Sequence, residues 1–117
     1  MAYHPFMATI YLIRHGETPT TGKILPGRAP GLHLSERGCM QAAAVAKQLA
    51  SVDAVYSSPL ERARETALPT CERFHKELVL DDGLLEADFG TWTGKSLADL
   101  ATLPEWQVVQ RLSLIHI

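Results

Sequence analysis

Apolar residues along the chain are grouped in short runs, and polar or glycine-containing sequence follows each run. The first run, residues 10–13, has no polar break and consists of isoleucine, tyrosine and leucine. Such a run predicts a strand that is buried on both faces of a parallel sheet covered by helices. Residues 52–56 and 78–80 predict two further short strands. The chain is therefore expected to form an α/β fold around a mostly parallel sheet.

Apolar positions at helical spacing, together with capping residues, predict two main helices between these strands. The first is expected to begin after Ser35 as its N-cap and to end near Ser51. The second is expected to begin with Ser58 as its N-cap and Pro59 at its first position, and Pro69 is expected to interrupt it. Two shorter helices are expected at residues 96–102 and 105–111. The order strand, helix, strand, helix implies right-handed parallel crossovers.

Side chains suited to phosphate chemistry follow the first predicted strand directly. Arg14 offers a planar fork for phosphate, His15 can serve as nucleophile, acid or base, and Gly16 lets the backbone approach a ligand. Arg62 lies one turn into the second helix, near an N-terminus whose dipole favours an anion. Ligands of open α/β sheets bind at the carboxyl edge of the strands. The sequence therefore predicts that Arg62 and His15 meet at that edge.

The segment between the first strand and the first helix, residues 18–34, is rich in Pro, Gly and Thr and is expected to be a loop. A loop of this length in a compact domain usually has a function. Arg28 is expected to face an anionic substrate, whereas a solvated position is an equal alternative for Lys23 and His33.

The composition narrows the classes of partner. At 117 residues the chain is at most one small domain, and its net charge of -2 gives no reason to expect nucleic acid or an anionic membrane surface. No apolar run approaches the roughly 18 residues of a membrane helix, and the N-terminus lacks the pattern of a signal peptide. Cys39 and Cys71 have no metal or redox spacing. They indicate free thiols in a reducing compartment, so a cytoplasmic location is expected.

Four stretches in chain order carry a resemblance to a known family. They are Leu12-Ile13-Arg14-His15-Gly16-Glu17-Thr18, then Leu34-Ser35-Glu36-Arg37-Gly38 with Gln41-Ala42, then Ser57-Ser58-Pro59-Leu60-Glu61-Arg62-Ala63 with Glu65-Thr66-Ala67, and Glu86-Ala87-Asp88-Phe89-Gly90 with Trp92 and Gly94. In combination they resemble the histidine phosphatase superfamily, the phosphoglycerate mutase-like proteins. The resemblance implies a three-layer α/β/α sandwich with a mostly parallel sheet, of which this sequence is expected to hold a truncated part.

The activity that the resemblance implies is hydrolysis of a phosphomonoester through a phosphohistidine intermediate, with a small phosphorylated molecule as the substrate. Phosphoglycerate mutase-type phosphoryl transfer is a near alternative. A catalytically inert phosphate-binding fragment is an alternative of a different class. An enzyme is expected for the full-length parent, whereas the activity of this chain is left open. No metal or other cofactor is implied, because arginines carry the positive charge, and the sequence does not indicate an oligomeric state.

The resemblance also assigns roles to single residues. His15 would be the nucleophile that carries the phosphoryl group, and Arg14 and Arg62 would clamp the phosphoryl oxygens. Glu86 would protonate the leaving oxygen and then activate water, although a lone glutamate in such a loop is more often a solvated carboxylate. The implied phosphate-binding set is Arg14, Gly16, Glu17, Thr18, Gly27, Arg28 and Arg62.

Two departures from the family pattern shape the expected domain organisation. Family members continue into a second half with a second catalytic histidine, usually followed by glycine, and this sequence has no such motif. Residues 1–111 are therefore expected to be the N-terminal portion of a histidine phosphatase domain, and residues 112–117 a non-native tail. Thr20 and Thr21 stand where a Trp-Asn pair often follows the signature, so a side-chain amide contact to phosphate is not expected.

Overall fold

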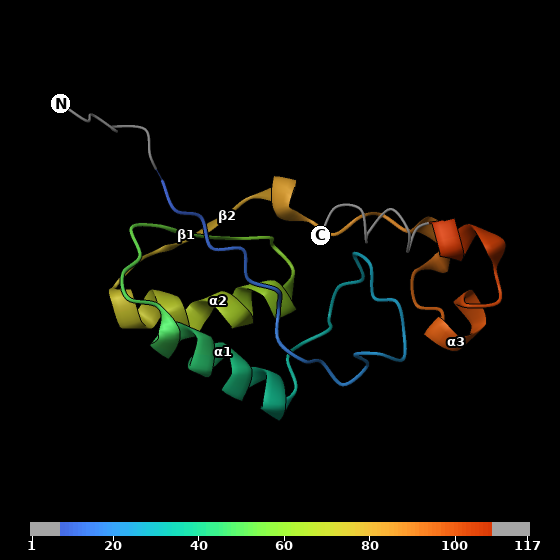
Figure 1. The fold of residues 1–117 in the computed structure, drawn as a ribbon, viewed down its shortest axis with the longest axis horizontal. Helices are drawn as coiled ribbons and strands as arrows, with labels where there is room; N and C mark the ends of the chain where they lie inside the picture. Colours follow the sequence, from blue (N-terminus) through green and yellow to red (C-terminus); the bar gives the residue numbers. More distant parts are fainter. Residues whose placement is uncertain (1–7, 109–117) are drawn as a thin grey trace.

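The computed structural model describes residues 8–108, which form an α/β arrangement. Its helices and strands follow in the order α1 (Glu36–Gln48), β1 (Val55–Ser57), α2 (Glu61–Phe74), β2 (Leu78–Leu80) and α3 (Leu97–Leu100). Helix α1 packs against α2, and α2 packs against both strands. The loop of residues 18–34 runs from this group toward α3, which lies at the other end of the molecule (Figure 1). No helix in the described part of the chain is long and apolar enough to cross a membrane.

The two strands form a parallel pair, as the sequence predicts. Val55 pairs with Leu78 and Ser57 with Leu80, and α2 makes the crossover between them. The strand predicted at residues 78–80 is confirmed, and the one predicted at 52–56 begins only at Val55. This β–α–β unit places the end of β1 and the start of α2 next to each other, which is where Arg62 lies.

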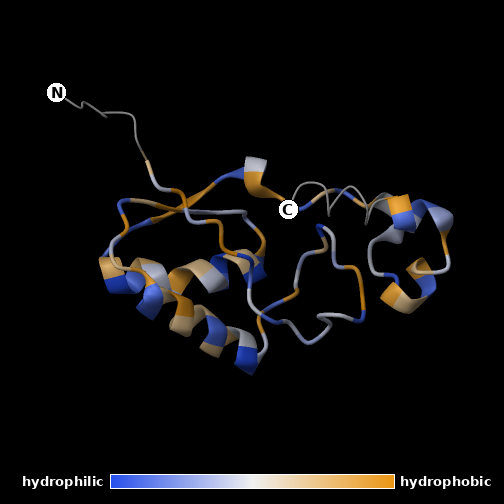
Figure 2. Ribbon diagram, viewed as in Figure 1, coloured by the Kyte–Doolittle hydropathy of each residue, from blue (hydrophilic) through white to orange (hydrophobic). Residues whose placement is uncertain are grey.

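The strand predicted at residues 10–13 is wrong for the described part of the chain. These residues belong to no strand or helix, and Ile10 and Leu12 are 78% and 91% exposed. Figure 2 shows this hydrophobic stretch as a coil outside the helices. A strand is held by backbone pairing with a neighbour, and the described sheet consists of β1 and β2 alone. In the described part of the chain, the apolar run therefore has no neighbouring strand to pair with and no helix that buries it.

Helix α1 confirms its predicted cap. The Ser35 hydroxyl accepts a hydrogen bond from the Gly38 amide at 3.1 Å, which satisfies one of the free donors of the first turn. Ala42 and Ala46 are the buried apolar side chains of the helix. Because alanine is small, this face can lie close to its neighbours. The helix ends at Gln48, slightly before the predicted end.

Helix α2 differs from prediction at its start and at its proline. It begins at Glu61 after Leu60, which makes no side-chain cap, so the predicted N-cap at Ser58 and first turn at Pro59 are wrong. The predicted interruption at Pro69 is also wrong, because the helix continues through it to Phe74. An interior proline costs about 3 kcal/mol. Packing against α1 and both strands supports the helix strongly enough to offset this loss.

An apolar cluster joins the long loop to the region around α3. Leu25, Leu100 and Trp106 form its buried centre, and the rings of Trp92 and Trp106 meet edge to face at 5.9 Å. The Leu25 amide donates to the Lys95 carbonyl at 2.9 Å. The short helix predicted at residues 96–102 is confirmed as α3. The helix predicted at 105–111 is observed at residues 104–108, and its remainder, like the predicted tail at 112–117, lies outside the described residues.

Candidate active site

Arg14, His15 and Gly16 line a pair of adjoining hollows of about 180 and 250 Å³. Helix α1 contributes Gln41 to both hollows, and α2 contributes Thr66 to the smaller one. The residues that the sequence singles out after the first apolar run therefore do face a cavity, even though that run is not a strand. A cavity lined by a cation and an imidazole can bind a small anion.

One ring nitrogen of His15 makes a hydrogen bond to the main chain. Nδ1 lies 2.8 Å from the carbonyl oxygen of Gly16. A carbonyl oxygen only accepts, so Nδ1 must carry the proton in this contact. In the neutral imidazole, Nε2 then holds a free lone pair. The half-buried His15 is thus set in the tautomer that a nucleophile acting through Nε2 requires.

The buried hydroxyl of Thr66 connects the His15 segment to α2. The Gly16 amide donates to Thr66 Oγ1 at 3.0 Å, and the same hydroxyl donates to the carbonyl of Arg62 at 2.7 Å. Thr66 therefore fixes the position of Gly16 relative to the helix that carries Arg62.

We expect Thr66→Val to destabilise the chain by about 1–3 kcal/mol, because it leaves the buried Gly16 amide without its acceptor. The midpoint of thermal unfolding should fall by roughly 5–10 °C. Thr66→Ser is the matched control, since it keeps the hydroxyl and should lose clearly less stability. A loss in Thr66→Ser without a loss in Thr66→Val would show that the methyl group, rather than the hydrogen bond, accounts for the stabilisation.

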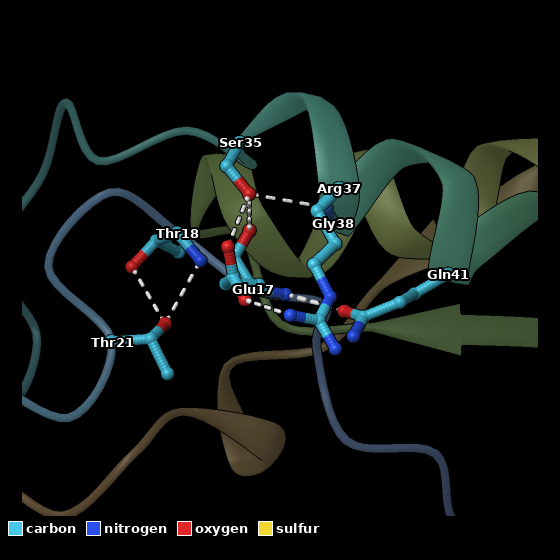
Figure 3. Close-up of polar contacts among 7 residues, drawn as sticks. All are labelled: Glu17, Thr18, Thr21, Ser35, Arg37, Gly38 and Gln41. Carbon is cyan, nitrogen blue, oxygen red and sulfur yellow. Dashed lines mark hydrogen bonds and ion pairs between the residues drawn. The ribbon is translucent and has the colours of Figure 1, made fainter.

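Glu17 is held by the first turns of α1 (Figure 3). Its carbonyl accepts from the Ser35 amide at 2.8 Å, and its own amide donates to Gln41 Oε1 at 2.9 Å. Its carboxylate accepts from the Ser35 hydroxyl at 3.2 Å and lies 3.8 Å from Arg37 Nη1. Glu17 also lines the larger hollow. These contacts give Glu17 a structural role, because they attach the His15 segment to α1.

The backbone of this segment lies so close to α1 that two glycines are required. A Cβ atom at Gly16 would lie 2.7 Å from the Gly38 carbonyl oxygen, and one at Gly38 would lie 2.1 Å from the Glu17 carbonyl oxygen. Both distances are shorter than real side chains show. The position of His15 therefore depends on the absence of a side chain at position 38.

Thr18 and Thr21 close the turn that follows. Thr21 Oγ1 accepts from the Thr18 amide at 2.8 Å and lies 3.1 Å from the Thr18 hydroxyl (Figure 3). Thr18 is buried, whereas Thr21 lines the larger hollow. The Thr21 hydroxyl thus supplies the side-chain hydrogen bonds that hold this turn.

His33, one of the two loop residues for which the sequence left alternatives open, contacts Glu65 of α2. Its Nδ1 lies 2.8 Å from a Glu65 carboxylate oxygen, and the other oxygen accepts from the Leu34 amide at 2.9 Å. Burial raises the pKa of Glu65, but these two hydrogen bonds outweigh it and leave the pKa below its ordinary value. The pair attaches the end of the long loop to α2.

Arg62 is buried, with only 2% of its surface exposed, and it binds the long loop. Its Nη2 donates to the Gly27 carbonyl at 2.5 Å and its Nη1 to the Ala29 carbonyl at 3.2 Å. Burial lowers the pKa of Arg62, and the charge of Glu86 opposes that effect. Its side chain does not line the two hollows described above, so the predicted pairing with Arg14 around one phosphoryl group stays a prediction.

Arg28 and Glu86 contact each other through the main chain of Glu86. Arg28 Nε donates to the Glu86 carbonyl at 2.7 Å, and a Glu86 carboxylate oxygen accepts from the Ala87 amide at 2.9 Å. Gly27, which precedes Arg28, has φ +51° and is buried. Gly27, Arg28, Arg62 and Glu86 thus form a second cluster.

The predicted site residues therefore gather in two clusters, linked through Thr66. Arg14, His15, Gly16 and Glu17 surround the hollows, and the second cluster lies on the long loop, the start of α2 and the segment that follows β2. The sequence-based prediction assigned no site role to the supporting residues Gln41 and Thr66 and included Ser35 only as a helix cap, although all three belong to the stretches that carry the family resemblance. Among the described residues, no group of three or more His, Cys, Asp or Glu side chains could hold a metal ion.

Comparison with known proteins decides the family. The family model of the histidine phosphatase superfamily (branch 1) matches residues 10–114. The chain belongs to this superfamily. The resemblance that the sequence motifs indicated is therefore confirmed.

Relatives of this chain include a protein named as a phosphatase. An uncharacterised protein of Mycobacterium tuberculosis is 46% identical over 85 residues, which cover 71% of this chain and 42% of that protein. Phosphoserine phosphatase 1 of Hydrogenobacter thermophilus is 39% identical over 93 residues, which cover 75% of this chain and 43% of that enzyme. The chain thus spans less than half the length of these relatives.

Solved structures support the fold. The native structure of a mycobacterial glucosyl-3-phosphoglycerate phosphatase matches with a TM-score of 0.70 and 31% identity, over 83% of this chain and 47% of that one. The predicted α/β class with a parallel, phosphoglycerate mutase-like sheet is therefore confirmed.

Proposed function

We propose that the protein is a phosphatase that hydrolyses a small phosphomonoester through a phosphohistidine at His15. The observation that carries the proposal is the contact of His15 Nδ1 with the Gly16 carbonyl, which in the neutral imidazole leaves the lone pair on Nε2, in a residue that lines a hollow together with Arg14. Membership of a superfamily whose relatives include phosphatases supports it. The free thiols of Cys39 and Cys71 fit a cytoplasmic location, which we propose with it.

In the first step, Nε2 of His15 forms a bond to phosphorus while the bond from phosphorus to the ester oxygen breaks. Glu86 gives its proton to the departing oxygen, so that an alcohol leaves. In the second step, Glu86 takes a proton from water, whose oxygen attacks phosphorus and displaces His15. Inorganic phosphate leaves, and both residues return to their starting states. Arg14 would stabilise the negative charge that spreads over the phosphoryl oxygens.

The proposed role of Arg62 involves an exchange of partners. In the structure its two terminal nitrogens bind the carbonyls of Gly27 and Ala29. Hydrogen bonds from a guanidinium to a phosphoryl oxygen are charge-assisted and about twice as strong as those to a neutral carbonyl. A phosphoryl group brought to this end of α2 would therefore compete well for the same donors.

The proposal is tested by trapping the intermediate in the complete gene product. The protein is mixed with a phosphomonoester labelled on phosphorus, quenched in alkali and digested, and the labelled peptide is identified. We expect an alkali-stable, acid-labile label on His15 and release of inorganic phosphate. If phosphoglycerate is added and the label on His15 passes to it rather than to water, the mutase activity is favoured instead. Binding of phosphate without any label would favour the inert alternative.

We expect Arg62→Ala to lower turnover about a hundredfold, because one preorganised charged donor stabilises the transition state by roughly 3 kcal/mol. The Michaelis constant should change much less, since this contact strengthens as charge spreads in the transition state. Arg64→Ala, two positions along the same helix, is the matched control and should keep turnover within a few-fold. A rise in the Michaelis constant with turnover intact would mean that Arg62 only recruits substrate.

A further inference from the structure

The peptide group between Glu86 and Ala87 is held from both sides. Its carbonyl oxygen accepts from Arg28 Nε at 2.7 Å. Its N–H donates to Glu86 Oε1 at 2.9 Å. The two hydrogen bonds share one rigid peptide plane, so a donor that fixes the carbonyl also fixes the direction of the N–H. The orientation of the Glu86 carboxylate is thereby coupled to Arg28.

Arg28 is itself held in place by the neighbouring peptide groups. The carbonyls of Gly27 and Ala29, on either side of it, both accept from the buried guanidinium of Arg62. A side chain at Gly27 would meet Thr93 Oγ1 at 3.1 Å and the Phe89 ring at 3.3 Å, so this part of the loop also packs closely against the segment after Glu86. The backbone that carries Arg28 is therefore attached to the start of α2.

We propose that Arg28 is a positioning residue, which orients the carboxyl group of Glu86 for proton transfer by fixing the Glu86–Ala87 peptide plane. The inference rests on the proposed function, in which Glu86 is the acid. This role differs from direct phosphate binding, because it acts through the hydrogen bond of Arg28 Nε to the Glu86 carbonyl rather than through a contact to the phosphoryl group. The contact of Arg28 with the Glu86 carbonyl does not involve Arg62, so it stays in place when Arg62 exchanges its carbonyl partners for a phosphoryl group.

The consequence for catalysis depends on the leaving group. An alkoxide is a poor leaving group and needs a proton in the transition state, whereas 2,4-dinitrophenolate leaves without one. A misplaced acid should therefore slow transfer from an alkyl phosphate and leave transfer from 2,4-dinitrophenyl phosphate unchanged. Loss of a phosphate contact should slow both, because both transfer the same phosphoryl group.

The experiment measures the first turnover of the complete gene product, with enzyme in excess, on a simple alkyl phosphate and on 2,4-dinitrophenyl phosphate. Arg28→Met should slow alkyl transfer about tenfold, a part of the hundredfold or more that a general acid provides. Transfer from the dinitrophenyl ester should stay within twofold, which also shows that the variant is folded. Lys23→Met, which removes another exposed cation of the same loop, should change neither rate.

A double-variant cycle separates the two roles of Arg28. If Arg28 acts through Glu86, adding Arg28→Met to Glu86→Gln should cause no further loss with the alkyl phosphate. Losses that multiply, or equal slowing of both substrates by Arg28→Met, would overturn the positioning role while the phosphohistidine mechanism stands. Absence of label on His15 in the unaltered protein would instead overturn the proposed function itself, so the two failures are distinguishable.

Discussion

His15→Ala is expected to abolish both the phosphoenzyme and the turnover of the complete gene product. Removing a nucleophile removes the covalent route altogether, and such losses are on the order of 10⁴-fold or more in turnover. The structure supports His15 as this nucleophile, since the hydrogen bond from its Nδ1 to the Gly16 carbonyl directs the lone pair of the neutral ring to Nε2. The measurement is steady-state release of phosphate, together with alkali-stable label after a rapid quench.

His75→Asn is the matched control for this result. His75 is an exposed histidine at the C-terminal end of α2 with φ 55°, a left-handed conformation that asparagine also adopts. It lies at the opposite end of α2 from Arg62. This control should keep both label and turnover. Label that survives in His15→Ala would assign the intermediate to another residue.

Much of the fold was predictable because it depends on local signals. The N-cap at Ser35, the helix after it and the strand at residues 78–80 each follow from residues that lie next to one another in the sequence. The parallel pairing of β1 and β2 follows from the helix between them. These features need little information from distant parts of the chain.

The wrong predictions concern features that depend on distant partners. Residues 10–13 have the composition of a buried strand, but burial requires a neighbouring strand and a covering layer, and the described residues supply neither to them. Pro69 predicts a break from its local cost, whereas packing against α1 and the sheet decides the outcome. The pattern of a sequence states a preference, and the tertiary contacts decide whether it is realised.

In the candidate site too, features that depend on residue type were predictable and features that depend on distant partners were not. Arg14, His15 and Gly16 could be chosen from the sequence because their chemistry is visible in it, and they do surround a hollow. The partners of Arg28 and Arg62 could not be chosen in this way. Their guanidinium groups bind main-chain carbonyls, which every residue has, so no side-chain type marks the contact.

Gly38→Ala is expected to destabilise the protein and to lower turnover about a hundredfold. Alanine favours a helix over glycine by about 1 kcal/mol, so propensity alone predicts a more stable α1. The added Cβ, however, would lie 2.1 Å from the carbonyl oxygen of Glu17, and a contact of this kind requires a backbone shift of about 1 Å. Overpacking of this kind costs roughly 1–3 kcal/mol, which outweighs the gain in propensity. The free energy of unfolding should therefore fall by up to about 2 kcal/mol.

The loss of turnover follows from where the shift occurs. The Glu17 carbonyl also accepts from the Ser35 amide, and Glu17 is two residues from His15, so moving this oxygen moves the nucleophile. A displacement of about 1 Å near reacting groups can cost on the order of a hundredfold in rate. Ala43→Gly, on the exposed face of the same helix, measures propensity alone and should cost about 1 kcal/mol with turnover unchanged. If Gly38→Ala proved more stable than the unaltered protein and equally active, the close approach of the His15 segment to α1 would not exist in solution.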